Sequence, residues 1–148
     1  MLTSYFALGS IVLQDASPSF EAAVSQSVSL LVGSGQAQAG YVDEVLESLE
    51  ALGPYFVIAP GLALAHAKPS AAALEPGMAL LKLTEPVRSG SANDPVSLVF
   101  SMCSPNASDH LEMLADFGEL MSTEKVMNSL LNASAQSVIE EILFKKAV

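Results

Sequence analysis

His66 and His110 are the side chains of this sequence best suited to nucleophilic chemistry, since a neutral imidazole is a competent nucleophile near pH 7. His66 lies between Ala65 and Ala67, directly after a short apolar run, and Lys68 follows two positions on. Small neighbours leave the imidazole accessible, and the lysine favours an incoming phosphate anion. On residue type alone, a single histidine in such a place is more often a partly buried, hydrogen-bonded residue than a catalytic one.

His110 falls in the first turn of a helix that is expected to start at Ser108 and Asp109. The free backbone N–H groups of a helix start favour an anion and disfavour a protonated imidazole. Taken alone, His110 is interpreted as a surface histidine near the helix start. A histidine at a strand end and one at a helix N-terminus could flank a single anion pocket, but the sequence alone does not bring His66 and His110 together.

Cys103 is the single cysteine, and it is interpreted as a buried core thiol because it ends an apolar run. A Cys–His dyad stays open as an alternative, since no spacing selects it. One cysteine excludes an internal disulfide and a cysteine-rich metal site, and neither Glu-x-x-His nor His-x-x-x-His occurs. No glycine-rich phosphate loop or Gly-x-Ser-x-Gly elbow occurs either. We therefore expect no metal and no cofactor.

The acidic side chains cluster on two expected helices. Carboxylates spaced in this way are expected to form solvated faces, and a general acid–base pair is the less common role. They are Asp43, Glu44, Glu47 and Glu50 in one segment, and Glu140 and Glu141 in the other.

The composition predicts one folded, acidic domain. The 148 residues are 51% apolar and 15% charged, with a net charge of −10. A chain of this length suits one domain and hides about two-thirds of its extended surface on folding. The acidity argues against nucleic acid and anionic membranes as partners, because both select clustered Lys and Arg. The uncharged runs are too polar, or too interrupted by Gly and Pro, to span a membrane.

The spacing of apolar residues predicts helices and short strands in mixed order. Residues 1–14 are expected to be part strand and part short helix. Helices are predicted from Ser17-Pro18 to Gly33, over about 40–52, and from starts at Ser108, Ser122-Thr123 and Ser134. Strands are predicted at 55–58, 62–64, 78–83 and 96–102, with loops over 67–77 and 85–94. This order predicts a single-domain α/β sandwich, with one mixed β-sheet flanked by helices and a helical C-terminal third.

One long segment resembles a known family. The run from Gly53 to Pro69, GPYFVIAPGLALAHAKP, closely resembles the active-site segment of enzyme IIA proteins of the phosphoenolpyruvate-dependent sugar phosphotransferase system (PTS), mannitol/fructose type. Within this family, the segment looks like the ascorbate-type IIA branch. Weaker matches extend the resemblance over nearly the whole chain beyond residue 20. They are Tyr41-Val42, Met78–Leu83, Glu85-Pro86-Val87, Asn93-Asp94-Pro95-Val96 and Asp109-His110-Leu111.

The resemblance implies a phosphoryl carrier. His66 would match the histidine that accepts a phosphoryl group from the phosphocarrier protein HPr and passes it to a cysteine of a cognate EIIB. His110 would match a neighbouring histidine that contacts the phosphoryl group. The resemblance also implies a single EIIA type-2 domain over residues 1–148 and indirect coupling to the membrane component EIIC. With one cysteine and no disulfide framework, a reducing cytosol is the expected compartment. Because a IIA carries phosphoryl groups and no sugar, this chain does not specify the sugar.

Three positions depart from the family pattern. Ala65 stands where the family commonly has proline, and Lys68 stands where the ascorbate branch has arginine. Ser48 lies in the region of the second helix where the mannitol branch has an arginine that serves the phosphoryl site. Lysine keeps the positive charge of arginine but loses its planar, two-point grip on phosphate.

Two other functions stay open. In a regulatory EIIA-like protein, phosphorylation of His66 would control binding to another protein. A small-anion binding module would use the two histidines without a covalent step. For the carrier, HPr is expected to approach an apolar surface around His66, to which Leu62, Leu64 and Ala67 are expected to contribute.

Overall fold

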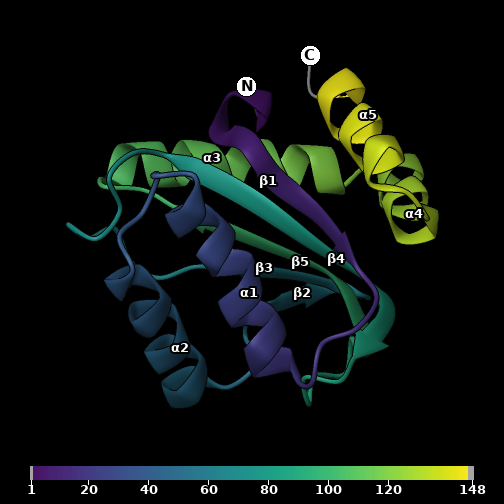
Figure 1. Cartoon of the computed structure of the whole chain (residues 1–148), viewed down its shortest axis with the longest axis horizontal. Helices are drawn as coiled ribbons and strands as arrows, with labels where there is room; N and C mark the ends of the chain where they lie inside the picture. Colours follow the sequence, from purple (N-terminus) through teal and green to yellow (C-terminus); the bar gives the residue numbers. More distant parts are fainter. Residues whose placement is uncertain (1, 147–148) are drawn as a thin grey trace.

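A five-stranded mixed sheet forms the middle layer of the computed structural model, which describes residues 2–146 (Figure 1). The strand order is β1-β4-β5-β3-β2. β1 runs parallel to β4 and β3 runs parallel to β5, whereas the pairs β4–β5 and β2–β3 are antiparallel. The strands are β1 (Phe6–Gln14), β2 (Val57–Ala59), β3 (Leu62–Ala65), β4 (Gly77–Val87) and β5 (Val96–Cys103).

Helices cover both faces of this sheet (Figure 1). α1 and α2 pack on one face, and α3, α4 and α5 pack on the other. They are α1 (Phe20–Gly33), α2 (Gly40–Leu52), α3 (Ala107–Met121), α4 (Glu124–Asn132) and α5 (Gln136–Lys146), preceded by a 3-10 turn at Leu2–Tyr5. The predicted α/β sandwich with a helical last third is confirmed. Within the described range, no helix is long and apolar enough to cross a membrane.

The central strands are buried on both faces, which explains their continuous apolar runs. Along β3, Ala63 and Ala65 belong to the core under α1 and α2, whereas Leu62 and Leu64 belong to the core on the opposite face. Phe100 of β5 joins this second core and meets an aromatic ring of α3 edge-on, with 4.9 Å between centroids. Each large apolar side chain buried in this way stabilises the fold by about 1.5–3 kcal/mol. The adjacent ends of β3 and β5 are therefore held firmly.

Two helix starts differ from the predicted ones because a neighbouring residue makes the cap. α1 begins after Ser19, not at Ser17-Pro18, since the extended Ser19 accepts a hydrogen bond from an N–H of the first turn at 3.0 Å. α3 is capped by Asn106, ahead of the predicted start at Ser108, and the Asn106 side chain accepts from the N–H of Asp109 at 2.8 Å. In both cases several residues that could cap the helix lie close together. The sequence pattern therefore predicts the first residue of the helix only to within two positions.

β4 is longer than predicted, so the loop assigned to 85–94 is wrong for its first three residues. Val87 pairs with Val96, and the N–H of Glu85 donates to the carbonyl oxygen of Asp15 at 2.7 Å. This end of β4 is largely exposed to solvent. The residues at this end of β4 lack a continuous apolar run because they face solvent, and not because the strand has ended. β2 likewise begins two residues later than the predicted strand at 55–58.

β1 is an edge strand that α5 partly covers. The side chain of Gln136 accepts a hydrogen bond from the N–H of Leu13 at 3.2 Å. The rings of Phe144 and Phe6 meet edge-on, with centroids 6.4 Å apart. Pairing with β4 is irregular after Phe6, where Gly9 adopts a positive φ of 85° that only glycine reaches without strain. β1 is therefore bent at Gly9, and α5 covers part of its free edge.

Lys82 is a lysine buried in the middle of β4, with 3% of its surface exposed. Its ammonium donates to the carbonyl oxygens of Leu130, Leu131 and Ala133 at 2.7, 2.8 and 3.1 Å. These carbonyls lie at the C-terminal end of α4, where few partners within the helix are available and the helix dipole favours a cation. Burial lowers the pKa of Lys82, and the three carbonyls replace part of the lost hydration. Lys82 thus ties the last turn of α4 to the sheet.

We expect Lys82→Met to lower the free energy of unfolding by about 1–3 kcal/mol, because buried carbonyls lose their donor. Urea unfolding followed by circular dichroism measures this loss. Lys125→Met, on the exposed side of α4, is the matched control and is expected to change stability little. Equal unfolding midpoints for the two variants would contradict the role assigned to the buried ammonium.

Candidate functional site

His66 comes directly after β3, at the edge of the sheet where the parallel strands β3 and β5 both end. Its side chain is half-buried, and its Nδ1 lies 2.9 Å from the carbonyl oxygen of Leu64. A carbonyl oxygen only accepts, so Nδ1 carries the ring proton and donates it, while Nε2 keeps its lone pair. The local backbone therefore leaves one nucleophilic nitrogen on the ring.

The structure places His110 beside His66. Their ring centroids lie 5.6 Å apart, with the ring planes at 54°. His110 lies in the first turn of α3, which begins after Asn106. A short loop connects the end of β5 to this helix, and the parallel partner β3 ends next to it. The two predicted residues, 44 positions apart in the sequence, thus meet at one edge of the sheet.

Two aromatic residues border His66. The ring centroids of Tyr55 and Phe56 lie 6.1 and 5.7 Å from that of His66. The hydroxyl of Tyr55 donates to the backbone carbonyl of His66 at 3.3 Å and accepts from the hydroxyl of Ser48. The sequence analysis did not identify either aromatic residue as part of the site. Their position in the segment 53–69 was the only signal that could have found them. These rings limit the movement of the His66 imidazole.

Both imidazoles are held in the neutral form. Burial lowers the pKa of His66, and the hydrogen bond to Leu64 opposes this shift. Burial also lowers the pKa of His110, and the neighbouring His66 lowers it further, because two adjacent imidazolium charges repel. The neutral ring is the form with a free lone pair, so His66 is a competent nucleophile at neutral pH.

The Nδ1 atom of His110 is buried and has no hydrogen-bond partner within the described part of the chain. A buried N–H group without an acceptor is rare in proteins, so we place the ring proton of His110 on Nε2. His110 then offers an N–H donor, whereas His66 offers a lone pair. A lone pair beside a donor suits an electrophile that carries negative charge.

The three positions that depart from the family pattern lie in different places. Ala65 is fully buried at the end of β3, and Lys68 is exposed two residues beyond His66. Ser48 reaches Tyr55 from α2, so this helix contributes a hydroxyl and not a cation to the border of the site.

The prediction that Leu62, Leu64 and Ala67 form an exposed apolar surface is wrong. These side chains are only 1%, 2% and 8% exposed, because helices cover both faces of the sheet at β3. Two other apolar side chains reach the surface beside the histidines. Tyr55 is 40% exposed, and Leu111, the neighbour of His110, is 66% exposed.

Cys103 is a buried core thiol, as predicted. Its Sγ donates to the carbonyl oxygens of Gln36 and Glu75, and burial raises the pKa of the thiol to about 12. A thiol that stays protonated is neither a nucleophile nor a metal ligand. Among residues 2–146, no group of three or more His, Cys, Asp or Glu side chains comes together as a metal site would require.

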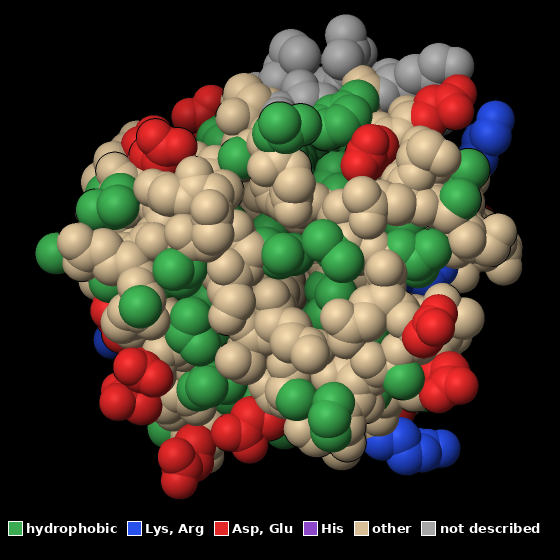
Figure 2. Space-filling view, viewed as in Figure 1, with side chains coloured by type: hydrophobic (Ala, Val, Ile, Leu, Met, Phe, Trp, Pro, Cys, Tyr) green, Lys and Arg blue, Asp and Glu red, His purple; other side chains and the backbone are tan. Residues whose placement is uncertain are grey.

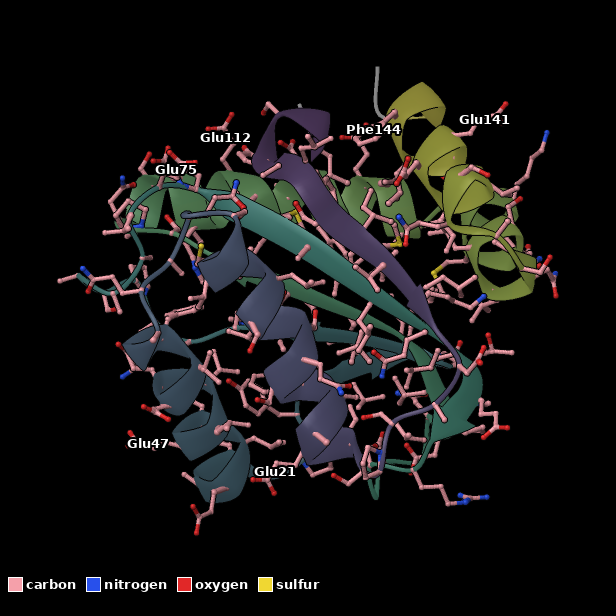
Figure 3. All side chains as sticks on the ribbon, viewed as in Figure 1. Glu21, Glu47, Glu75, Glu112, Glu141 and Phe144 are labelled. Atoms are coloured by element: carbon pink, nitrogen blue, oxygen red, sulfur yellow. The ribbon has the colours of Figure 1, made fainter. Side chains whose placement is uncertain are left out.

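The acidic side chains of α2 face solvent. Asp43, Glu47 and Glu50 are exposed. Figure 3 shows Glu47 pointing away from the sheet, and Glu21 of α1 does the same. On the face that Figure 2 shows, acidic side chains are spread around the rim. The solvated face predicted for α2 is confirmed, and on α5 Glu141 is exposed and Glu140 half-buried.

Both histidines are expected to titrate below their ordinary pKa of 6.5. The unfolded chain then binds protons more readily than the folded one, so stability falls as the pH drops from about 6.5 towards the folded pKa values. The imidazole C–H resonances measure both midpoints by NMR. His66→Gln is expected to raise the midpoint of His110, because a neighbouring positive charge is removed. An unchanged or lower His110 midpoint would contradict the coupling of the two rings.

Comparison with known proteins supports one family over nearly the whole chain. The profile of the family described as "Phosphoenolpyruvate-dependent sugar phosphotransferase system, EIIA 2" matches residues 4–146. The mannitol-specific cryptic phosphotransferase enzyme IIA component of Escherichia coli (strain K12) is 28% identical over 142 residues, which cover 96% of this chain and 97% of that protein. The ascorbate-specific PTS system EIIA component of the same strain is 36% identical over 105 residues, covering 70% and 68%.

Solved structures agree with the sequence relatives. The solution structure of the mannitol-specific cryptic enzyme IIA from Escherichia coli has a TM-score of 0.90 at 27% identity, over 97% of this chain and 98% of that one. The Escherichia coli complex of mannitol enzyme IIA with phosphorylated enzyme IIB gives a TM-score of 0.77 at 22% identity, over 95% and 99%, which shows a shared fold. The resemblance inferred from residues 53–69 is confirmed: the chain belongs to the EIIA 2 family of the phosphoenolpyruvate-dependent sugar phosphotransferase system.

Proposed function

We propose that this protein is a phosphoryl carrier, in which His66 accepts a phosphoryl group from phospho-HPr and passes it to a cysteine of a cognate EIIB. Membership of a phosphotransferase family supports the general role. The observation that carries the proposal is the 2.9 Å contact between Nδ1 of His66 and the carbonyl oxygen of Leu64. This contact holds the ring proton on Nδ1 and leaves Nε2 as the nucleophile.

In the proposed reaction, the lone pair of His66 Nε2 forms a bond to phosphorus while the bond from phosphorus to the donor atom of phospho-HPr breaks. The donor keeps the bonding electrons. Nε2 is already unprotonated, so the step needs no general base and depends on in-line positioning and charge neutralisation. In the onward step, the thiolate sulfur of the EIIB cysteine forms a bond to the same phosphorus while the bond from phosphorus to Nε2 breaks, and Nε2 recovers its lone pair.

His110 is proposed to bind the transferred phosphoryl group through its Nε2–H. The positive end of the α3 dipole lies in the same turn of helix. Phosphorylation of His66 places negative charge beside His110, and an adjacent negative charge favours the protonated imidazole. His110 therefore changes from a neutral to a charged donor when the phosphoryl group arrives.

The proposed carrier is a single EIIA domain that spans residues 1–148 and works in the cytoplasm. It reaches the membrane component EIIC only through EIIB.

Incubation with enzyme I, HPr and phosphoenolpyruvate tests the carrier role, with intact mass as the readout. We expect the wild type to gain one acid-labile phosphoryl group and His66→Ala to gain none, because the nucleophile is removed. His110→Ala is expected to accept the group about 10²-fold more slowly, as when one donor to a developing charge is lost.

A folded wild type that gains no phosphoryl group while a control IIA does so would sink the carrier proposal. Reversible binding of phosphate without a phosphohistidine would favour the anion-binding module. A phosphohistidine that forms but does not move on to EIIB would favour the regulatory function.

Leu111 is proposed to contact HPr, because it is the exposed apolar neighbour of His110. Leu111→Asp is expected to slow transfer from phospho-HPr roughly tenfold, as for loss of a moderate interface contact. Leu8→Asp is the matched control, since Leu8 is fully exposed on β1, the outermost strand on the side of the sheet away from β3. Equal transfer rates for the two variants would exclude Leu111 from the docking surface.

A further inference from the structure

The hydroxyl of Tyr41 lies between backbone groups at the ends of β3 and β5. The side chain comes from α2 and is fully buried. Its O–H donates to the carbonyl oxygen of Met102 at 2.7 Å, and its oxygen accepts from the N–H of Ala67 at 3.0 Å. Burial raises the pKa of Tyr41, so the hydroxyl stays protonated. One hydroxyl thus bridges the residue after His66 and the end of β5.

The strand register indicates what this hydroxyl replaces. The parallel ladder of β3 and β5 begins where the N–H of Leu98 donates to the carbonyl oxygen of Gly61 at 3.0 Å. Bonds in a parallel ladder repeat at every second residue of each strand. Continued to the end of β3, this ladder would join the N–H of Ala67 directly to the carbonyl oxygen of Met102. The Tyr41 hydroxyl occupies that position.

An inserted hydroxyl separates the two strands where His66 leaves the sheet. A direct N–H···O=C bond spans about 2.9 Å between nitrogen and oxygen, whereas the bridge through Tyr41 consists of two consecutive hydrogen bonds. Beyond β5, the chain passes through a short loop to the N-cap Asn106 and then to His110. The distance between the ends of β3 and β5 therefore influences the distance between the two imidazole rings, whose centroids lie 5.6 Å apart.

We propose that Tyr41 is a positioning residue, whose hydroxyl holds the ends of β3 and β5 apart and thereby sets the spacing of His66 and His110 for phosphoryl transfer. The kinetic part of this inference rests on the proposed function, whereas the ring spacing is a property of the unphosphorylated protein. Packing alone does not account for the hydroxyl, because phenylalanine would fill nearly the same volume and need no polar partners.

Tyr41→Phe tests the inference, since it removes the hydroxyl and keeps the ring. Ser27→Ala is the matched control. It removes another fully buried hydroxyl, which donates to the carbonyl oxygen of Val99 in β5 at 2.7 Å. Three quantities are compared in the wild type and both variants: the rate of transfer from phospho-HPr, the NMR titration midpoints of the two histidines, and the urea midpoint of unfolding.

Tyr41→Phe is expected to slow transfer roughly tenfold or more, because a small displacement of a reacting group is costly. It is also expected to shift the titration midpoints of the two histidines, whose mutual distance changes. Ser27→Ala is expected to lose stability without either effect. A folded Tyr41→Phe with the wild-type rate and midpoints would overturn the proposal. Equal effects in Ser27→Ala would overturn it too, because general loosening would then explain both.

Failure of the proposed function gives a different result. A wild type that accepts no phosphoryl group refutes the carrier role, and the histidine midpoints then decide the role of Tyr41. If Tyr41→Phe does not fold, the wild type supplies the deciding measurement. A slowly exchanging Tyr41 hydroxyl proton with a nuclear Overhauser contact to the Ala67 amide supports the bridge. An Ala67 amide that exchanges as fast as exposed amides contradicts it.

Discussion

The parallel pairing of β3 with β5 determines where both histidines lie. Parallel neighbours end at the same edge of a sheet, so the chain that leaves β3 with His66 and the chain that leaves β5 towards His110 start from adjacent points. This pairing extends to Ala65 opposite Ser101 and is covered by helices on both faces. A slip of one residue would exchange the two faces of β3 and carry His66 away from α3. The contact between the rings of His66 and His110 presupposes this register.

Burial and backbone hydrogen bonding set the protonation of the site without a fixed ionic partner. The carbonyl of Leu64 selects the tautomer of His66, and burial keeps both imidazoles neutral. The border formed by α2 carries the hydroxyl of Ser48, where an arginine would provide a permanent two-point grip on anions. In the proposed carrier, such a neutral site gains positive charge on His110 only once the phosphoryl group has been placed beside it.

Local patterns in the sequence predicted most of the fold, because period and capping residues act over short distances. Apolar runs predicted the central strands around Phe100, and capping residues at the helix starts predicted the helical last third. The end of β4 was missed, because its pairing of Val87 with Val96 lies outside an apolar pattern. For the site, the segment ending in His66 was recognisable, but its distance to His110 depends on tertiary pairing. The expected exposure of Leu64 failed for the same reason: local sequence does not show that helices cover both faces of β3.

The two edges of the sheet are closed in different ways. β2 has only three residues, whereas β1 is bent at Gly9 and has the N–H of Leu13 occupied by the side chain of Gln136 from α5. An open edge offers unpaired N–H and C=O groups to strands of other molecules, which is a common route to aggregation. The short β2 and the partly covered β1 therefore offer few unpaired groups to a strand of another copy. The C-terminal helix, remote from the histidines, in this way protects one edge strand against edge-to-edge pairing.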